Sequence, residues 1–197
     1  MRTIATTAAL CLIGFAAVTP LANAQPPLPR KAPEITIVEP SGNKTLLSSY
    51  KGKVVVLALI STTCPHCQKE CEMLTQLYSE MKPKGVQMAA IAFNDNAAAL
   101  VPGFIRDHGV MFPVGYTNLD TMMGFMGFSV MDRPLVPQVA VIDKKGMIRA
   151  QSPPGGDTNL QDMAFLRNLI NNLLSEGAAT SHKAAPAGKT AAKGSSN

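Results

Sequence analysis

The feature that most constrains the fold is an uninterrupted aliphatic run at residues 54–60, which is followed almost at once by a helical pattern. A run of this length without a polar side chain is typical of a strand that is buried on both faces of a sheet. Residues 65–81 then carry apolar side chains at helical spacing, and residues 86–93 predict a second buried strand. This succession of strand, helix and strand predicts an α/β domain with a parallel core.

The rest of the predicted fold comes from weaker strand and helix patterns. They predict strands at residues 35–38, 44–47, 111–116, 138–142 and 147–151, and helices at residues 97–108, 119–128 and 160–175. Pro102 should delay or kink the first of these helices, because proline lacks the N–H that a helix interior needs. Gly177 can end the last helix. The expected product is a central mixed sheet flanked by helices, with an N-terminal β-hairpin as an extension.

The first 24 residues have the composition of a secretory signal peptide. A weakly basic start precedes a short apolar run and the small residues Ala22-Asn23-Ala24, which form a cleavage-site pattern. The apolar run is shorter than the roughly 20 residues that a membrane span needs, so an uncleaved anchor is the less favoured alternative. We therefore expect the mature chain to begin at Gln25 and to be periplasmic or exported, where thiols are held oxidised.

Two further segments flank the predicted domain. Residues 25–33 contain four prolines and predict an extended linker outside the packed core. Residues 177–197 lack large apolar side chains, which predicts a disordered tail and leaves one folded domain at residues 34–176. The formal net charge of +5 is spread over scattered basic residues, and only 5% of residues are aromatic, so we expect no nucleic-acid partner.

Cys64-Pro65-His66-Cys67 lies where the first predicted strand passes into the helix. The unpaired N–H groups and the dipole at a helix start stabilise a thiolate, so Cys64 is the predicted nucleophile. Cys67 follows within the first turn and can close a disulfide with Cys64, while Pro65 suits this turn because its missing N–H costs nothing there. A zinc site would need a second close pair of ligands, so we expect a redox dithiol without metal or cofactor.

His66 lies between the two cysteines and should influence the redox potential. An imidazole that donates to the nearby thiolate, or neutralises it when protonated, stabilises the reduced form. A dithiol with a stabilised reduced form is an oxidant, so the sequence favours oxidising exchange. The alternative is a solvated His66 without this role.

These residues resemble the thioredoxin-like periplasmic thiol-disulfide oxidoreductases of the TlpA and ResA type. The similarity covers residues 32–174, and its motifs are Gly52-Lys53, Cys64-Pro65-His66-Cys67, Glu70, residues 109–114, and Val136-Pro137-Gln138 before a strand that ends at Asp143 with Gly146 beyond it. The resemblance implies a thioredoxin-like fold and protein thiol or disulfide clients. It also implies a membrane redox partner that resets the dithiol.

The resemblance further implies roles for residues outside the dithiol. Pro137 matches the cis proline that faces the cysteines in this family, and Val136 and Pro137 would shape the substrate groove. Glu70 matches the family's active-site glutamate, which would accept a proton from the buried thiol; a solvated helix carboxylate is the alternative. The Pro65-His66 pair and Val136 resemble the DsbA oxidase centre, whereas the scaffold resembles reductases. The oxidase and reductase directions therefore both stay open.

Two other functions are compatible with the sequence. Thr63-Cys64 and the two residues before them resemble the Ser/Thr-x-x-Cys of peroxiredoxins, although Leu57 stands where their motif has proline. Cys67, Cys71 and several methionines offer soft ligands for Cu(I) delivery, although methionines among aromatic residues are more often core side chains. Cys71 itself is expected to be an inert buried thiol, with regulatory pairing to Cys67 as the alternative.

Overall fold

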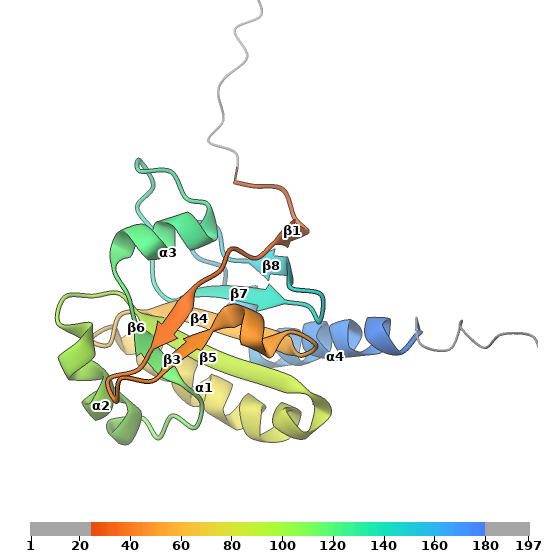
Figure 1. The fold of residues 1–197 in the computed structure, drawn as a ribbon, viewed down its shortest axis with the longest axis horizontal. Coiled ribbons are helices and arrows are strands. Elements are labelled where there is room, and N and C mark those ends of the chain that lie inside the picture. Colours follow the sequence, from red (N-terminus) through yellow and green to blue (C-terminus); the bar gives the residue numbers. More distant parts are fainter. Residues whose placement is uncertain (1–24, 180–197) are drawn as a thin grey trace, which may run out of the picture.

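The computed structural model of the protein describes residues 25–179, and an eight-stranded mixed sheet lies at its centre (Figure 1). The strands are β1 (Arg30–Lys31), β2 (Thr36–Val38), β3 (Lys44–Leu46), β4 (Val54–Ile60), β5 (Val86–Ala92), β6 (Val114–Tyr116), β7 (Gln138–Ile142) and β8 (Met147–Gln151). The α-helices are α1 (Pro65–Met81), α2 (Ala97–Asp107), α3 (Leu119–Met126) and α4 (Met163–Ala179). The order of strands across the sheet is β1-β8-β7-β4-β5-β6-β2-β3.

The aliphatic run and the second predicted buried strand form the central strands β4 and β5. They pair in parallel with Val54 opposite Val86, and β7 pairs with the other edge of β4 in the antiparallel direction. Every residue of both strands is buried. Burial of one large aliphatic side chain contributes about 1.5–3 kcal/mol, so these strands supply much of the stabilisation of the domain. The predicted parallel core is confirmed.

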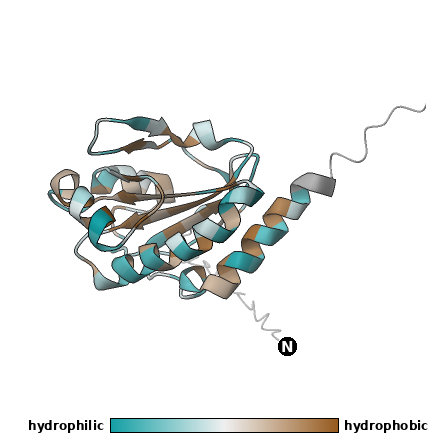
Figure 2. Cartoon of the chain, turned by 90° about the horizontal axis from the view of Figure 1, so that it is seen from below, coloured by the Kyte–Doolittle hydropathy of each residue, from teal (hydrophilic) through white to brown (hydrophobic). Residues whose placement is uncertain are grey.

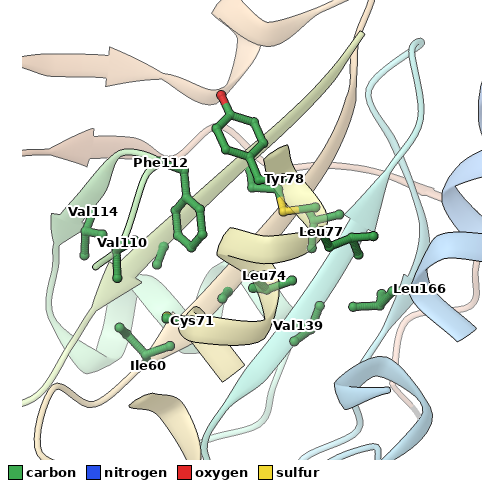
Figure 3. Close-up of a cluster of buried hydrophobic side chains, with 14 of the residues drawn as sticks. Ile60, Cys71, Leu74, Leu77, Tyr78, Val110, Phe112, Val114, Val139 and Leu166 are labelled. Atoms are coloured by element: carbon green, nitrogen blue, oxygen red, sulfur yellow. The ribbon is translucent and has the colours of Figure 1, made fainter. Parts of the chain in front are cut away.

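Helices cover both faces of this sheet. On one face, Val56 and Ala58 of β4 join a cluster with buried side chains of α1, α2 and α4, part of which Figure 3 shows. On the opposite face, Leu57 and Leu59 of the same strand join a second cluster with α3 and the N-terminal hairpin. The strands form an apolar centre, and many hydrophilic residues lie on the outer sides of the helices (Figure 2). One aliphatic run serves both clusters because successive side chains of a strand point to opposite faces.

Both predicted hairpins are present. β2 pairs antiparallel with β3, and β7 pairs antiparallel with β8. The N-terminal hairpin joins the sheet through β6, where Val38 lies opposite Tyr116. Gly115 permits this close approach, because a Cβ at that position would lie 2.8 Å from Ile37 Cγ2. The predicted fold class, a mixed sheet flanked by helices with an N-terminal hairpin, is therefore confirmed.

Two residues of the segment at residues 25–33, which was predicted to be an extended linker outside the core, instead pair with the edge of the sheet. Arg30 and Lys31 form the edge strand β1, which pairs antiparallel with β8. The Arg30 guanidinium donates to Gln151 Oε1 at 2.6 and 3.1 Å and to the Phe125 carbonyl oxygen at 2.7 Å. Proline tolerates a position beside an edge strand, so a proline-rich composition does not prevent such pairing.

Two helix boundaries also differ from the predictions. α2 begins at Ala97 with Pro102 inside it, so the proline does not delay the helix. The buried side chains of Val101 and Phe104 pack this helix onto the sheet and offset the one hydrogen bond that Pro102 cannot make. α4 begins later than predicted, because Asp162 Oδ1 accepts from the Phe165 N–H at 2.7 Å and so caps the first turn.

The C-terminal helix extends further than predicted. α4 continues through Gly177 to Ala179, so the prediction that Gly177 ends the helix is wrong. A helical glycine costs only about 1 kcal/mol relative to alanine, which the rest of a long helix can absorb. The predicted signal peptide and most of the predicted tail lie outside the described residues. Within residues 25–179, no helix is both long and apolar enough to cross a bilayer.

Candidate active site

The dithiol lies at the carboxyl end of β4, where the chain turns into α1. The Cys64 N–H donates to the Ser61 carbonyl oxygen at 3.2 Å and closes the turn, and α1 begins at Pro65 with Cys64 as its N-cap. Cys64 is partly exposed, whereas Cys67, within the first turn, is fully buried. Only one of the two sulfurs can therefore meet another protein.

Burial controls the chemistry of Cys67. Loss of water around the sulfur is the main cause that raises the pKa of the Cys67 thiol to about 12, and the neighbouring Cys64 and Glu70 contribute to the same rise. One contact opposes this effect, since the Ser61 N–H donates to Cys67 Sγ at 3.4 Å and lowers the pKa. At neutral pH Cys67 is therefore a thiol that must lose its proton before it can attack.

Glu70 is buried rather than solvated. Its side chain is 4% exposed, and Oε1 has no hydrogen-bond partner among the described residues. Burial raises the pKa of this carboxyl to about 8. It lies one turn after Cys67, and its charge is one of the causes that raise the pKa of the Cys67 thiol. Glu70 thus has both the position and the affinity to exchange a proton near neutral pH.

The loop before β7 reaches the exposed sulfur. The Val136–Pro137 peptide bond is cis, and Cys64 Sγ lies 3.9 Å from the Val136 carbonyl oxygen. The structure therefore places the Val136 carbonyl oxygen beside the exposed sulfur, and the groove role that the family resemblance implies for Val136 and Pro137 stays a prediction.

His66 is exposed. It lines a pocket of about 360 Å³ together with Leu135, Val136, Pro137 and Asp157. Within residues 25–179 no hydrogen bond joins His66 to Cys64 or Cys67. A larger cavity of about 540 Å³ lies at the opposite end of β4, next to Val55, and so belongs to another part of the molecule.

Comparison with known proteins identifies the family of the chain. The chain matches the AhpC/TSA family over residues 28–151, which is more than half of its length. The protein belongs to the AhpC/TSA family. It is 32% identical to the thiol-disulfide oxidoreductase ResA of Bacillus thuringiensis (strain Al Hakam) over 122 residues, 62% of this chain and 67% of that protein. The predicted family relationship is confirmed, and this AhpC/TSA protein is a thiol-disulfide oxidoreductase.

Solved structures support the fold of this AhpC/TSA protein. A thiol:disulfide interchange protein from Chlorobium tepidum TLS matches with a TM-score of 0.62 at 23% identity, covering 78% of this chain and 99% of that one. A thiol:disulfide interchange protein from Bacteroides sp. matches with a TM-score of 0.60 at 20% identity, covering 79% and 94%. At these identities the likeness concerns the fold alone, which is thioredoxin-like as predicted.

The candidate ligands for copper lie apart in this family member. Cys71 is fully buried, and desolvation raises the pKa of its thiol strongly. Met122 and Met126 are fully buried in the cluster under α3, whereas Met131 is exposed. Among the residues that the structure describes, no group of three or more His, Cys, Asp or Glu side chains is placed to hold a metal ion.

Two site residues were missed in the sequence. Asn94 and Gln68 both bind Thr62, the residue two before Cys64. A signal for Asn94 existed, because it closely follows the strand β5, and the carboxyl ends of parallel neighbours lie at the same edge of a sheet. Gln68 on α1 carried no comparable signal, since a polar residue on a helix is usually solvated.

Proposed function

We propose that this protein is an exported oxidoreductase that exchanges disulfides with protein clients through Cys64 and Cys67. The observation that carries the proposal is the unequal burial of the two sulfurs at the start of α1. The Cys64 thiolate attacks a client disulfide, a bond forms between Cys64 and one client sulfur, and the other client sulfur leaves as a thiolate. Cys67 then attacks Cys64, and the client is released as a dithiol.

A proton must leave Cys67 before this second attack. Glu70 is the acceptor that the geometry favours, because its unpartnered Oε1 is buried beside the thiol and its pKa of about 8 is close to ambient pH. Substrate approach is assigned to the segment at Val136 and Pro137, which lies against Cys64. The pocket beside His66 continues this surface.

Among the two directions of exchange, the geometry favours reduction of clients. An oxidising potential requires contacts that stabilise the reduced form. Cys67 does not stabilise the reduced form as a thiolate at neutral pH, because its thiol stays protonated. The contact of Cys64 Sγ is with an acceptor, the Val136 carbonyl oxygen.

Oxidation of clients is the second candidate. It is favoured by the Pro65-His66 dipeptide on the first turn of α1, where the helix dipole and a protonated imidazole would act together on a Cys64 thiolate. The sequence predicted this direction from His66, and it stays a prediction.

Export and partners complete the proposal. The pattern at residues 1–24 supports passage to the periplasm or beyond. A reductase that works there leaves each cycle as a Cys64–Cys67 disulfide, so it needs a donor of two electrons. We assign this task to a membrane redox partner that carries its own dithiol.

The reduction potential tests the direction. Equilibration with glutathione or thioredoxin, followed by alkylation of free thiols, should give a potential near that of thioredoxin, about −270 mV. A value near that of DsbA, about −120 mV, would establish the oxidase instead. Cys67→Ala should trap clients on Cys64 as mixed disulfides, and Cys64→Ala, the matched control, should trap none. If neither variant captures a client thiol, the proposed exchange is wrong.

A further inference from the structure

The turn before the dithiol is held by side chains that the exchange chemistry does not use. Thr62, in this turn, is 6% exposed, and all of its polar groups are bonded. Its N–H donates to Asn94 Oδ1 at 2.9 Å, its Oγ1 accepts from Asn94 Nδ2 at 3.0 Å, and its carbonyl oxygen accepts from Gln68 Nε2 at 3.2 Å. Thr62 Oγ1 also lies 3.3 Å from Asn94 Oδ1. The turn is thus clamped by two side chains from outside it.

Asn94 is itself held in place. The Phe93 N–H donates to the Ile60 carbonyl oxygen at 3.1 Å, which aligns the ends of β4 and β5. Asn94 Nδ2 donates to the Asp95 carbonyl oxygen at 3.0 Å, and the Asn94 carbonyl oxygen accepts from the Ala97 N–H at 3.1 Å. A side chain with this many fixed contacts holds its partner in one geometry.

The clamped turn reaches both cysteines through Ser61, one at its sulfur and the other at its backbone N–H. The Ser61 N–H donates to Cys67 Sγ at 3.4 Å, and the Ser61 carbonyl oxygen accepts from the Cys64 N–H. When Cys67 becomes a thiolate, its negative charge develops opposite the Ser61 N–H. A donor that is already aimed at a developing charge lowers the barrier without reorganisation.

We propose that Asn94 is a positioning residue for the resolving step, because by holding Thr62 it keeps the Ser61 N–H aimed at the Cys67 sulfur. The inference rests on the proposed exchange function and deepens it. In this step the Cys67 thiolate attacks Cys64 Sγ of a mixed disulfide and forms the Cys64–Cys67 bond. The bond between Cys64 and the client sulfur breaks, and the client leaves with the electron pair as a thiolate.

Asn94→Ala separates the two steps of exchange. It leaves the Thr62 N–H and Oγ1 without their partners, so the turn loosens and the developing Cys67 thiolate loses a fixed donor. Capture of a disulfide by Cys64 does not use this donor. The resolving step should therefore slow about tenfold, the size expected for one hydrogen bond to a charged group.

Ellman's reagent measures the two steps in one stopped-flow experiment. The reduced protein should release a first equivalent of thionitrobenzoate when Cys64 attacks and a second when Cys67 resolves the adduct. For Asn94→Ala we expect a second phase that is about tenfold slower and whose pH midpoint is shifted upward, with the first phase within about twofold of wild type. The pH midpoint distinguishes a positioning role from general loosening of the fold.

Asn118→Ala is the matched control. Asn118 Oδ1 also accepts from a backbone N–H, that of Thr121 at 2.8 Å, but it caps α3 on the other face of the sheet. This variant should lose stability and leave both phases and the pH midpoint unchanged. The proposal would be overturned if the second phase of Asn94→Ala had the wild-type rate. It would also be overturned if both variants lost rate equally in both phases.

Thr62→Val keeps the inference testable if Asn94→Ala does not fold. It retains the N–H bond to Asn94 Oδ1 and removes only the two contacts of Oγ1 with Asn94, so the second phase should slow about threefold. An unchanged second phase in this variant would also overturn the proposal. A wild-type protein that releases no second equivalent would instead contradict the exchange function itself.

Discussion

Two faces of the sheet are closed to water, one under α3 and the other under the start of α1. Among the described residues, only the second face buries thiols and a carboxyl beside the reactive dithiol. The cluster under α3 contains aliphatic, methionine and phenylalanine side chains, such as Met126 and Phe125. Beneath α1, Cys67, Glu70 and Cys71 are buried within two turns of helix. The comparison shows that one face buries apolar side chains, whereas the other also buries a carboxyl and two thiols whose pKa values burial raises.

Replacement of the exposed sulfur should have the largest effect. Cys64→Ser should reduce exchange with a disulfide substrate to the background rate, because no other accessible thiol is present in residues 25–179. Reduction of insulin disulfides measures this loss. Cys71→Ser, on the same helix but fully buried, should retain most activity. If Cys64→Ser kept its activity, the sulfur at the start of α1 would not be the reactive group, and the two faces would not differ in function.

A cavity under α3 should affect stability alone. Met126 is fully buried, and Met126→Ala should lower the free energy of unfolding by about 2–5 kcal/mol. Urea denaturation measures this change. Both phases of the reaction with Ellman's reagent should stay at wild-type rates in conditions where the variant is folded. A selective loss of the second phase would mean that the α3 face also positions the dithiol.

The buried carboxyl should make the stability of the α1 face depend on pH. The pKa of Glu70 is raised from about 4.5 to about 8, so between these values the folded state holds a proton that the unfolded state releases. Wild-type stability should therefore fall as pH rises from about 4 to 8, and Glu70→Gln should remove a loss of roughly 2–5 kcal/mol across this window. Urea denaturation of the reduced proteins at pH 5 and pH 8 measures the difference.

Glu72→Gln is the matched control on the same helix. Its carboxylate is about half exposed and lies 2.8 Å from His108 Nδ1, so its removal should change the pH slope much less. If the free energy of unfolding depended on pH equally in Glu70→Gln and in wild type, the Glu70 carboxyl would be hydrated in solution rather than buried.

The smallest effect is expected at His66. If clients are reduced, His66→Ala should change the reduction potential by less than about 30 mV, because no hydrogen bond links this exposed side chain to a sulfur within the described residues. The same glutathione equilibration measures the shift. A fall of 60 mV or more would show that His66 stabilises the reduced dithiol, and would favour oxidation of clients.

The central part of the fold was predictable because its patterns are local. The aliphatic run of β4 and the helical spacing after it give the bounds Val54–Ile60 and Pro65–Met81 directly. β1 was missed because its pairing with β8 joins distant parts of the sequence and depends on contacts of Arg30. Pairing between distant strands produces no periodic pattern of apolar residues in the sequence, so it cannot be predicted from such a pattern.

The site was predictable where a residue type carries its own chemistry. The spacing of Cys64 and Cys67 predicts a dithiol, and the family resemblance pointed to Glu70 and Pro137. The burial of Glu70 and the clamp by Asn94 could not be inferred from the sequence, since each depends on neighbours that only the folded chain supplies.

The position of Cys67 allows the protein to remove adducts from its own reactive thiol, Cys64. Any thiol compound that becomes attached to Cys64, whether a client or glutathione, lies close to the sulfur of Cys67 in the first turn of the helix. Its removal is an intramolecular reaction, so the rate does not depend on how much free thiol the surroundings contain. In an oxidising compartment, where free thiols are scarce, a dead-end adduct on Cys64 would be cleared by the protein that carries it.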